Sequence, residues 1–337
     1  MTTRVGINGF GRIGRLTVRT INKYHRDTLS VAMINGPADT KTNAHLLKYD
    51  SAYGKYPGTV EAGEDSIIID GAPAKFSSER DPTKLPWGDN GVDIVIDSTG
   101  TLRDASLLKA HIDNGAKKVI LSAPGKNDDI TIVIGVNEKQ YEPDKHHIIS
   151  CASCTTNCIA PVAKVLHNDF GITKGLMTTV HAYTRDQNIL DRRHDDLRRA
   201  RSAAVNIVPT TTGAAKLVGQ LIPELEGRIT GISIRVPVPV VSLVDLVADL
   251  DKNVTVDEIN KSFSKAAEGE LRGILEYSED PLVSSDCLGT SSSAIFDSLS
   301  TMVIKDNMVK VLAWYDNEWG YSCRLSDLAS LVAEKGL

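Results

Sequence analysis

The chain has 337 residues, about twice the length of a typical domain, so we expect two domains. Its 43 acidic residues against 38 lysines and arginines give a net charge of −5, whereas general nucleic-acid binders are more often basic. No apolar run reaches the roughly 18 residues of a membrane span, and the N-terminus lacks the basic-then-apolar layout of a signal peptide. The five cysteines form no disulfide framework. These features predict a cytoplasmic protein with neither a membrane nor a nucleic-acid partner.

The first half of the chain alternates strand-like and helix-like segments. Apolar residues recur at helical spacing over residues 13–24, and a second helical segment begins near Asp104. Strands that alternate with helices indicate βαβ units on a parallel sheet. The predicted strands are residues 4–8, 29–34, 92–97 and 118–121.

The second half contains longer strand-like segments, after a predicted helix near residues 157–168. Several of these segments are adjacent, which predicts a mixed or antiparallel sheet with helices on one face. Residues 183–205 contain six arginines and no strand period, so we interpret them as a long irregular loop, of a kind that is usually functional. Residues 320–337 have helical periodicity and are predicted to return to the first domain. The predicted strands are residues 176–181, 229–236, 240–250, 301–304 and 309–314.

Gly9, Gly11 and Gly14 follow the first predicted strand and open the first predicted helix. In a dinucleotide-binding turn the first glycine makes the tight turn, the second lets the backbone approach a pyrophosphate, and the third allows close helix packing. A glycine-rich turn without a ligand is the alternative, but strand, turn, helix and second strand have the spacing of the Rossmann fingerprint. We therefore predict an α/β fold: a Rossmann-type parallel-sheet domain that binds a dinucleotide (residues 1–152 and 319–337) and a mixed or antiparallel-sheet α+β catalytic domain (residues 153–318).

The same fingerprint predicts an acidic residue at the end of the second strand, where it binds the ribose 2′-hydroxyl. Here that strand ends at Asn35 and Gly36, and position 36 has no carboxylate. Asp39 lies nearby but is expected to cap the following helix. Because a carboxylate would repel a 2′-phosphate, Gly36 removes that repulsion and leaves space.

Cys154 lies at the start of a predicted helix, where the helix dipole is expected to lower the thiol pKa and favour the nucleophilic thiolate. His181 ends a predicted strand, where a base could meet the thiol, although on spacing alone coincidence is the favoured explanation. Cys151 and Cys158 are expected to be bystanders, with Cys158 facing the core. Zinc at Cys151 and Cys154 is a weaker alternative, because no second Cys/His pair with metal spacing accompanies them, and we predict no metal.

Hydroxyl and arginine side chains recur near these two residues in the sequence. Thr184 and Arg199 lie in the long loop, and Thr212 and Gly213 directly precede a helical segment, which is an anion-binding geometry. Arg235 lies in an apolar strand, where its charge needs a partner. Each arginine alone is explained by a surface charge or a structural ion pair. Together with the glycine-rich turn and the thiol, the group favours a phosphorylated substrate.

These features together resemble the phosphorylating glyceraldehyde-3-phosphate dehydrogenases. The motifs occur in the family's order and span the chain, which makes the resemblance specific. They are residues 7–15 (INGFGRIGR), 46–51 (LLKYDS), 152–158 (ASCTTNC), 196–201 (DLRRAR), 209–216 (PTTTGAAK) and 314–318 (WYDNE).

The resemblance implies a mechanism that starts with attack of Cys154 on the aldehyde carbon. His181 lowers the thiol pKa and then acts as general base on the hemithioacetal hydroxyl. Hydride passes to the nicotinamide and leaves a thioester, which inorganic phosphate opens to 1,3-bisphosphoglycerate.

The resemblance also assigns residues to three binding sites. The substrate's C3 phosphate is assigned to Thr184 and Arg235. Inorganic phosphate is assigned to Ser153, Thr155, Arg199, Thr212 and Gly213. The dinucleotide is assigned to Arg12, Ile13, Arg80, Ser122 and Asn317, in addition to Gly9, Gly11 and Gly14 of the glycine-rich turn and Gly36 after the second strand.

Members of this family are homotetramers in which the arginine-bearing loop packs beside the neighbouring subunit's cofactor. A related phosphate-aldehyde dehydrogenase, such as one for erythrose 4-phosphate, is the nearest alternative. Aspartate-semialdehyde dehydrogenase shares the architecture but would lack the pairing of the motifs at 153–158 and 210–213. A binding protein that lost catalysis is the third alternative, which the intact Cys154 and His181 disfavour.

Two departures from the NAD-specific pattern concern the same ligand. NAD-specific members have Asp where this chain has Gly36, and they have Leu-Pro in the long loop where this chain has Arg192 and Arg193. Arginine suits a phosphate through its bidentate fork. We therefore predict use of NADP or NAD, with dual use expected. The alternative is that both arginines pair with Asp191, Asp195 or Asp196.

Overall fold

The computed structural model describes residues 2–337 and divides the chain into two compact units. The first unit holds the chain up to Ile134, Glu138–Ser153 and Ser322–Leu337. The second unit holds Gly135–Asn137 and Cys154–Tyr321. The functional domain limits given by the sequence, at 152/153 and 318/319, stay a prediction.

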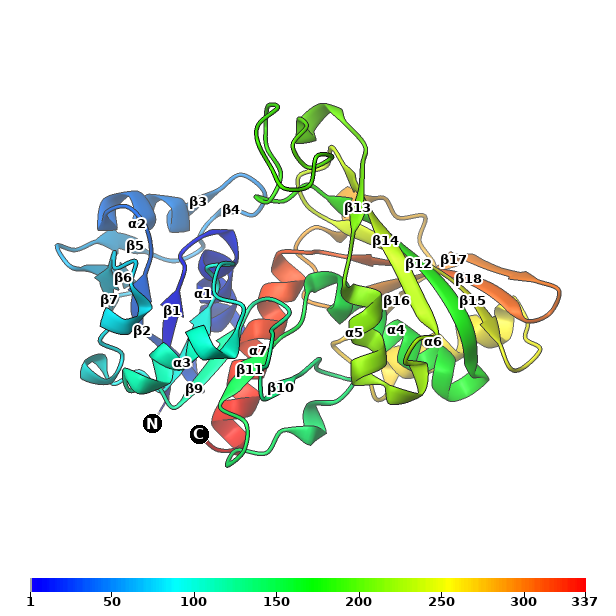
Figure 1. Cartoon of the computed structure of the whole chain (residues 1–337), viewed down its shortest axis with the longest axis horizontal. Helices are drawn as coiled ribbons and strands as arrows, with labels where there is room; N and C mark the ends of the chain where they lie inside the picture. The colour runs from blue at the N-terminus through cyan, green and yellow to red at the C-terminus, as the bar shows by residue number, and fades with distance from the viewer. Residues whose placement is uncertain (1) are drawn as a thin grey trace. The chain divides into compact units, whose positions relative to one another are not determined.

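A nine-stranded sheet forms the first unit, in the order β10-β11-β9-β8-β1-β2-β7-β6-β5 (Figure 1). All pairs from β10 to β7 are parallel, and β7, β6 and β5 pair antiparallel at one edge. The expected parallel Rossmann-type sheet is therefore confirmed. The strands are β1 (Thr3–Asn8), β2 (Leu29–Asn35), β5 (Val60–Ala62), β6 (Ser66–Ile69), β7 (Ala72–Ser77), β8 (Ile94–Asp97), β9 (Lys118–Leu121), β10 (Ile130–Thr131) and β11 (Ile148–Ser150), with β3 (Tyr49–Asp50) and β4 (Gly54–Lys55) as a separate pair.

Three helices connect these strands, and each begins where the sequence supplies a suitable residue. Helix α1 (Arg12–Tyr24) starts after Gly11 and buries the apolar face that the sequence pattern predicts. Asp39 caps α2 (Thr40–Lys48) by accepting the N–H of Thr42 at 2.7 Å, which confirms its expected role. Asp104 caps α3 (Ala105–Asp113) in the same way. Helix α7 (Trp319–Lys335) contributes its part from Ser322 onward to this unit.

A seven-stranded mixed sheet forms the second unit, in the order β13-β14-β12-β15-β18-β17-β16. The pairs β12/β14 and β16/β17 are parallel, and the other pairs are antiparallel, as the sequence predicts. The elements are α4 (Cys154–Phe170), β12 (Ile172–Ala182), β13 (Val208–Thr211), α5 (Ala214–Leu221), β14 (Ile229–Val236), β15 (Ser242–Leu250), α6 (Val256–Glu268), β16 (Leu275–Ser278), β17 (Ala294–Ile304) and β18 (Met308–Tyr315).

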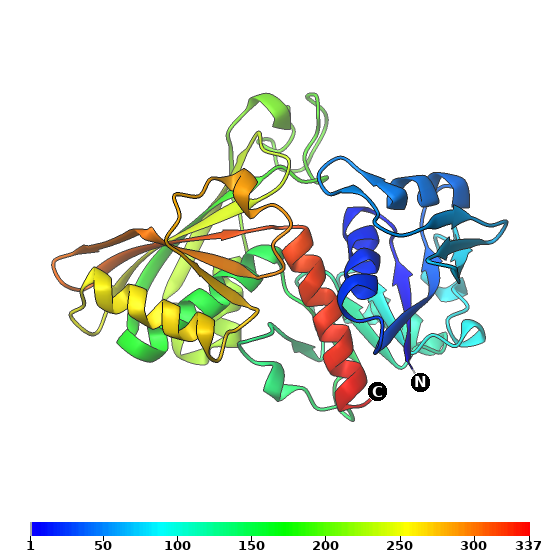
Figure 2. The ribbon, with the colours of Figure 1, turned by 180° about the vertical axis from the view of Figure 1, so that it is seen from behind.

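The helices α4, α5 and α6 pack on this second sheet (Figures 1 and 2). The central strand β15 alternates buried and half-buried residues along its whole length, so one face of the strand is covered and the other is partly open. Residues 183–207 form the long loop, which contains one 3₁₀ turn at Ala203–Val205 and no strand. Within residues 2–337, no helix combines the length and apolar character that crossing a bilayer requires.

Candidate active site

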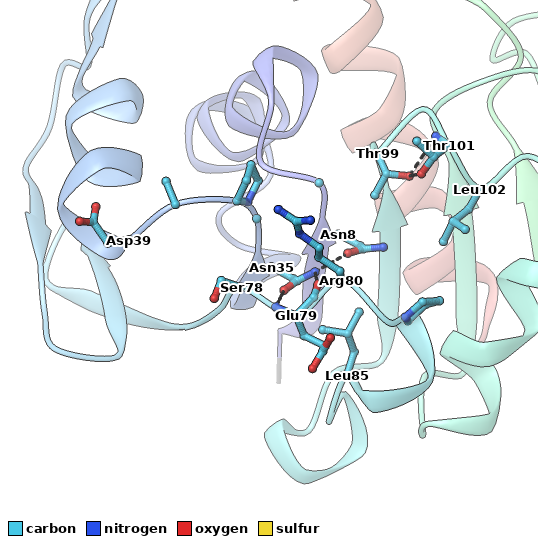
Figure 3. A pocket seen from close by; sticks show the side chains of 15 residues that line it. Asn8, Asn35, Asp39, Ser78, Glu79, Arg80, Leu85, Thr99, Thr101 and Leu102 are labelled. Carbon is cyan, nitrogen blue, oxygen red and sulfur yellow. Dashed lines mark hydrogen bonds between the residues drawn. The ribbon is translucent and has the colours of Figure 1, made fainter.

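A cavity of about 760 Å³ lies in the first unit, beside the carboxyl ends of β1 and β2. Gly9 and Gly36 line it together with Arg80, so the structure brings these three predicted cofactor residues together. Arg80 extends beside Asn8 and Asn35, while Asp39 lies apart near α2 (Figure 3). The crevice at the carboxyl ends of parallel strands is the usual dinucleotide site of such folds.

The glycines of this turn leave room that no other residue would leave. Gly9 has a φ of +94°, and an added Cβ would lie 2.5 Å from the Thr99 nitrogen. A Cβ on Gly14 would lie 2.2 Å from the Gly9 oxygen, because helix α1 approaches the turn that closely. The cavity and this bare backbone fit a dinucleotide whose pyrophosphate meets the start of α1.

Gly36 is tightly packed on one side. An added Cβ would lie 2.6 Å from the Phe10 Cβ, so a larger residue requires Phe10 to shift. The sequence predicts free space at Gly36, and the structure has that space on the side of the cavity but not on the side of Phe10.

Buried amides hold the floor of the cavity in place. The Asn8 amide donates to Asp97 Oδ2 at 2.7 Å, and Asn35 Nδ2 donates to Asn8 Oδ1 at 2.8 Å. Asn35 also exchanges hydrogen bonds with the backbone of Glu79, next to Arg80. Sequence analysis missed these asparagines, although each one ends a buried strand, where an amide needs partners.

The other predicted dinucleotide residues of this unit lie at the start of α1 and directly after β9. Gly11, Arg12 and Ile13 begin α1, and Ser122 follows β9. The Arg12 guanidinium is engaged with Asp50, at 3.0 Å and 3.3 Å. Burial would raise the pKa of Asp50, but the N–H groups of Ala52 and Tyr53 and the charge of Arg12 together lower it.

In the second unit, Cys154 Sγ lies 3.5 Å from His181 Nε2. Cys154 is the first residue of α4, and His181 is the second-last residue of β12. The structure thus brings together the two predicted catalytic residues. Cys158 is buried one turn further along α4, as expected from the sequence.

Hydrogen bonds fix the orientation of the imidazole. His181 Nδ1 lies 2.7 Å from the Ala182 oxygen and 3.1 Å from Arg235 Nη1. The shorter contact, to a carbonyl oxygen, favours the ring proton on Nδ1, which leaves the Nε2 lone pair facing the thiol. Arg235 Nη1 donates to the same oxygen at 3.1 Å and to Thr184 Oγ1 at 3.2 Å. The predicted C3-phosphate residues are therefore adjacent to the predicted base.

Burial favours the neutral form of both partners of the Cys–His pair. Burial raises the pKa of the Cys154 thiol, and Arg235 and Thr155 offset this only in part. Burial and then the positive charge of Arg235 lower the pKa of His181 to about 3. The direction for the thiol is opposite to the sequence-based expectation, because burial outweighs the helix start. Transfer of the thiol proton to Nε2 keeps the net charge of the pair unchanged.

Arg235 is a cation beside the thiol that can stabilise a thiolate and an anionic ligand. Burial lowers its pKa, and the neighbouring Cys154 raises it. Its Nε–H is buried and has no hydrogen-bond partner among residues 2–337. A buried donor without a partner is costly, so the site fits an anion such as a phosphate.

Tyr315 links α4 to β12 beneath the thiol. Its hydroxyl lies 2.9 Å from Thr155 Oγ1 and 2.9 Å from Thr179 Oγ1, and its ring packs edge-on against His181. The Thr155 hydroxyl, predicted to bind inorganic phosphate, points into this buried network. Sequence analysis missed Tyr315, although a tyrosine at the end of an apolar strand needs a partner for its hydroxyl.

Ser242 connects the base to Asn317. Its hydroxyl accepts the Ala182 N–H at 3.0 Å and donates to Asn317 Oδ1 at 2.9 Å. Asn317, predicted to bind the dinucleotide, is therefore held by the first residue of β15, the strand next to the one that carries His181. The sequence gives no local signal for Ser242.

The predicted inorganic-phosphate residues lie around Arg199. Its Nε donates to Thr210 Oγ1 at 2.9 Å and its Nη2 to the Thr211 oxygen at 3.3 Å, which ties it to the segment that precedes Thr212 and Gly213. Gly213 is the residue before α5. Ser153 directly precedes Cys154.

Arg192 and Arg193 lie exposed on the long loop. All five cysteines are free. Within the described part of the chain, no three His, Cys, Asp or Glu side chains are grouped so as to hold a metal ion.

The parallel-sheet unit with its glycine turn and the thiol–imidazole pair of the second unit define an NAD-binding oxidoreductase. Residues 3–105 match the family model for the glyceraldehyde 3-phosphate dehydrogenase NAD binding domain, and residues 153–317 match the model for the C-terminal domain. The chain belongs to the glyceraldehyde 3-phosphate dehydrogenase family.

Curated relatives match the chain from end to end. Glyceraldehyde-3-phosphate dehydrogenase from Geobacillus stearothermophilus is 56% identical over 337 residues, which are 100% of both chains. Glyceraldehyde-3-phosphate dehydrogenase 2 from Streptomyces avermitilis is 56% identical over 335 residues, 99% of this chain and 100% of that protein. Glyceraldehyde-3-phosphate dehydrogenase 1 from Bacillus cereus is 54% identical over 335 residues, again 99% of this chain and 100% of that protein.

We expect replacement of Arg235 by Gln to slow alkylation of Cys154 by iodoacetamide several-fold at neutral pH. Removing the cation raises the thiol pKa further, so less thiolate is present at any pH below that pKa, and the rate profile moves to higher pH. The measurement is the alkylation rate against pH, with exposed Arg198→Gln as the control. An unchanged profile for Arg235→Gln would show that the guanidinium does not stabilise the thiolate.

Proposed function

We propose that this protein oxidises glyceraldehyde 3-phosphate in the presence of inorganic phosphate, through a thioester on Cys154. The 3.5 Å contact between Cys154 Sγ and His181 Nε2 carries the proposal, with the full-length family match as support. A thiol with an oriented base within reach is the arrangement that covalent catalysis on a carbonyl requires.

The residues supply each proton transfer of this reaction. His181 Nε2 takes the Cys154 proton, Sγ bonds to the aldehyde carbon, and the proton passes to the new alkoxide to give a hemithioacetal. His181 then removes that hydroxyl proton while the C1 hydrogen leaves as hydride. The bound nicotinamide dinucleotide supplies the hydride acceptor. A phosphate oxygen next attacks the thioester carbon, and the expelled thiolate recovers its proton from His181.

Two anion sites flank the pair in this proposal. Arg235 and Thr184 bind the C3 phosphate, since the partnerless Nε–H of Arg235 lies next to the base. Arg199 binds the attacking phosphate, with Ser153, Thr155, Thr212 and Gly213. The backbone N–H of Thr155 serves here, because its hydroxyl is engaged with Tyr315.

We expect Cys154→Ala to abolish turnover and to retain dinucleotide binding, because the thiol acts only on the aldehyde. The measurements are the steady-state rate with glyceraldehyde 3-phosphate and with erythrose 4-phosphate, each with and without phosphate, and dinucleotide binding by calorimetry. Cys158→Ala, one turn along α4, is the matched control and should keep its activity. Turnover by Cys154→Ala would contradict the mechanism, and a faster rate with erythrose 4-phosphate would contradict the substrate.

We also propose that the enzyme uses NADP alongside NAD. Gly36 lines the dinucleotide cavity without a carboxylate, and Arg80 lies in the same cavity. The two carboxylates that line it are both engaged with backbone N–H groups, Asp39 with Thr42 and Glu79 with Asp81. These bonds orient both carboxylates but leave them negative, so Arg80 is the group of this cavity that favours a 2′-phosphate.

The arginines of the long loop support the same proposal. Neither the Arg192 guanidinium nor the Arg193 guanidinium makes an ion pair or hydrogen bond with any residue in the range 2–337. Two of their three expected partners are occupied: Asp191 pairs with Arg201 at 2.8 Å, and Asp196 accepts from Thr210 at 2.6 Å. Asp195 forms no ion pair within the described residues. In a tetramer of the family type, these guanidiniums are available to a neighbouring subunit's cofactor.

We expect Gly36→Asp to lower kcat/KM for NADP⁺ at least about tenfold relative to Gly36→Ala, which corresponds to roughly 1.4 kcal/mol. Both variants push against Phe10, so the alanine variant controls for packing and the difference isolates the carboxylate. The measurement is kcat/KM with each dinucleotide. A hundredfold preference of the unmodified enzyme for NAD⁺ would refute NADP use.

We propose a homotetramer on the basis of exposed apolar side chains in the second unit. Leu176 on β12 is 66% exposed and Ile232 on β14 is 49% exposed, on neighbouring strands of one sheet. Monomers rarely leave such groups uncovered. Other exposed apolar residues of this unit are Ile189, Leu190, Leu197, Leu299, Met302 and Ile304.

We expect sedimentation to give four times the chain mass, and Leu176→Glu to dissociate the assembly, because a carboxylate cannot be buried unpaired in an apolar contact. Leu107→Glu, at a 50% exposed leucine of α3, is the control. A monomeric unmodified protein would refute the proposal.

A further inference from the structure

The guanidinium of Arg199 is already fully engaged in this structure. Its Nη1 donates to Asp186 in a short ion pair, its Nε donates to Thr210, and its Nη2 donates to the Thr211 oxygen. Asp196 lies 3.5 Å from the same Nε. A guanidinium with two carboxylates beside it has little free charge to offer an anion.

Asp186 is the most exposed member of this group, and besides Arg199 its carboxylate has one longer contact, 3.6 Å to His194 Nε2. Its side chain is 49% exposed against 19% for Arg199, and it lies in the long loop after β12. Asp196, by contrast, also accepts from Thr210 and from the Arg198 N–H. A bound anion that displaces Asp186 from Arg199 therefore requires less rearrangement than one that displaces Asp196.

The pair also acts on Arg235, the cation beside the reacting sulfur. The pKa of Arg235 is lowered mainly by burial and is raised by Cys154, and Arg199 and Asp186 act on it as well, with opposite signs. The Asp186 carboxylate thus offsets the positive charge that Arg199 presents to a ligand.

We propose that Asp186 determines the affinity of the inorganic-phosphate site by occupying Arg199 until the anion displaces it. The inference rests on the proposed role of Arg199 in binding phosphate. An anion must compete with a carboxylate that is tethered to the same chain, so binding is weakened by the cost of separating the ion pair. The same competition favours departure of the acyl phosphate, because Asp186 recovers Arg199 as the product leaves.

The test is the KM for phosphate in Asp186→Asn and Asp186→Glu. The asparagine variant should lower this KM about fivefold to tenfold and leave the KM for the aldehyde within twofold, on the scale of one charge–charge contact near a protein surface. The glutamate variant should keep the unmodified value. Asp195→Asn removes an equal charge from the same loop at a residue without an ion pair in the described chain, and should change nothing. An unchanged or raised phosphate KM in Asp186→Asn would refute the proposal.

A second pair of variants separates this inference from the function on which it rests. Arg199→Gln should raise the phosphate KM, and adding Asp186→Asn to it should then have no further effect. If Arg199→Gln leaves the phosphate KM unchanged, Arg199 does not bind phosphate and the site assignment fails. If Arg199→Gln raises it and Asp186→Asn alone does not lower it, only the role of Asp186 fails. Faster alkylation of Cys154 in Asp186→Asn would provide a readout that a purely structural role does not move.

Discussion

The proposed chemistry depends on one contact, the 3.5 Å approach of Cys154 Sγ to His181 Nε2. Burial alone would keep the thiol protonated and the imidazole neutral, which is the direction of both pKa shifts. Transfer of the thiol proton to the imidazole needs no proton exchange with solvent and leaves the net charge of the pair unchanged. Arg235 is placed to stabilise the resulting thiolate. The buried environment that opposes ionisation in the resting protein also strengthens each electrostatic contact once a ligand is bound.

The backbone around this contact is held by strained turns and shared hydrogen bonds. Ala152 has a φ of 56° just before α4, and Val241 has a φ of 72° just before Ser242. A positive φ is costly for a β-branched residue, so packing must impose it. At the second turn, the result is a serine that holds both the strand of the base and Asn317. A change at Ser242 would therefore affect the base and the predicted nicotinamide contact together.

Sequence patterns were sufficient for the features that depend on local periodicity. The βαβ start, strands β9 and β14, and the capping role of Asp39 follow from apolar spacing and cap chemistry. The short strands β5 and β6 and the contacts of Tyr315 did not follow, because they depend on partners distant in the sequence. The direction of the Cys154 pKa shift was also missed, since a sequence shows a helix start but not how deeply that start is buried.

The arginines of this chain divide by whether its own carboxylates neutralise them. Arg12 is paired with Asp50, Arg199 with Asp186 and Arg201 with Asp191, at distances that leave these cations partly compensated. Arg80, Arg192 and Arg193 have no such partner within residues 2–337. An unpaired guanidinium is well hydrated and costs little, but it keeps its full charge for an incoming phosphate. Arg103 and Arg185 likewise form no ion pair with a carboxylate within the same residues, so the lack of a partner does not by itself distinguish these three. In the proposed function, Arg192 and Arg193 are distinguished by their exposed place on the long loop, and this place, rather than the number of arginines, favours a ligand with an additional phosphate.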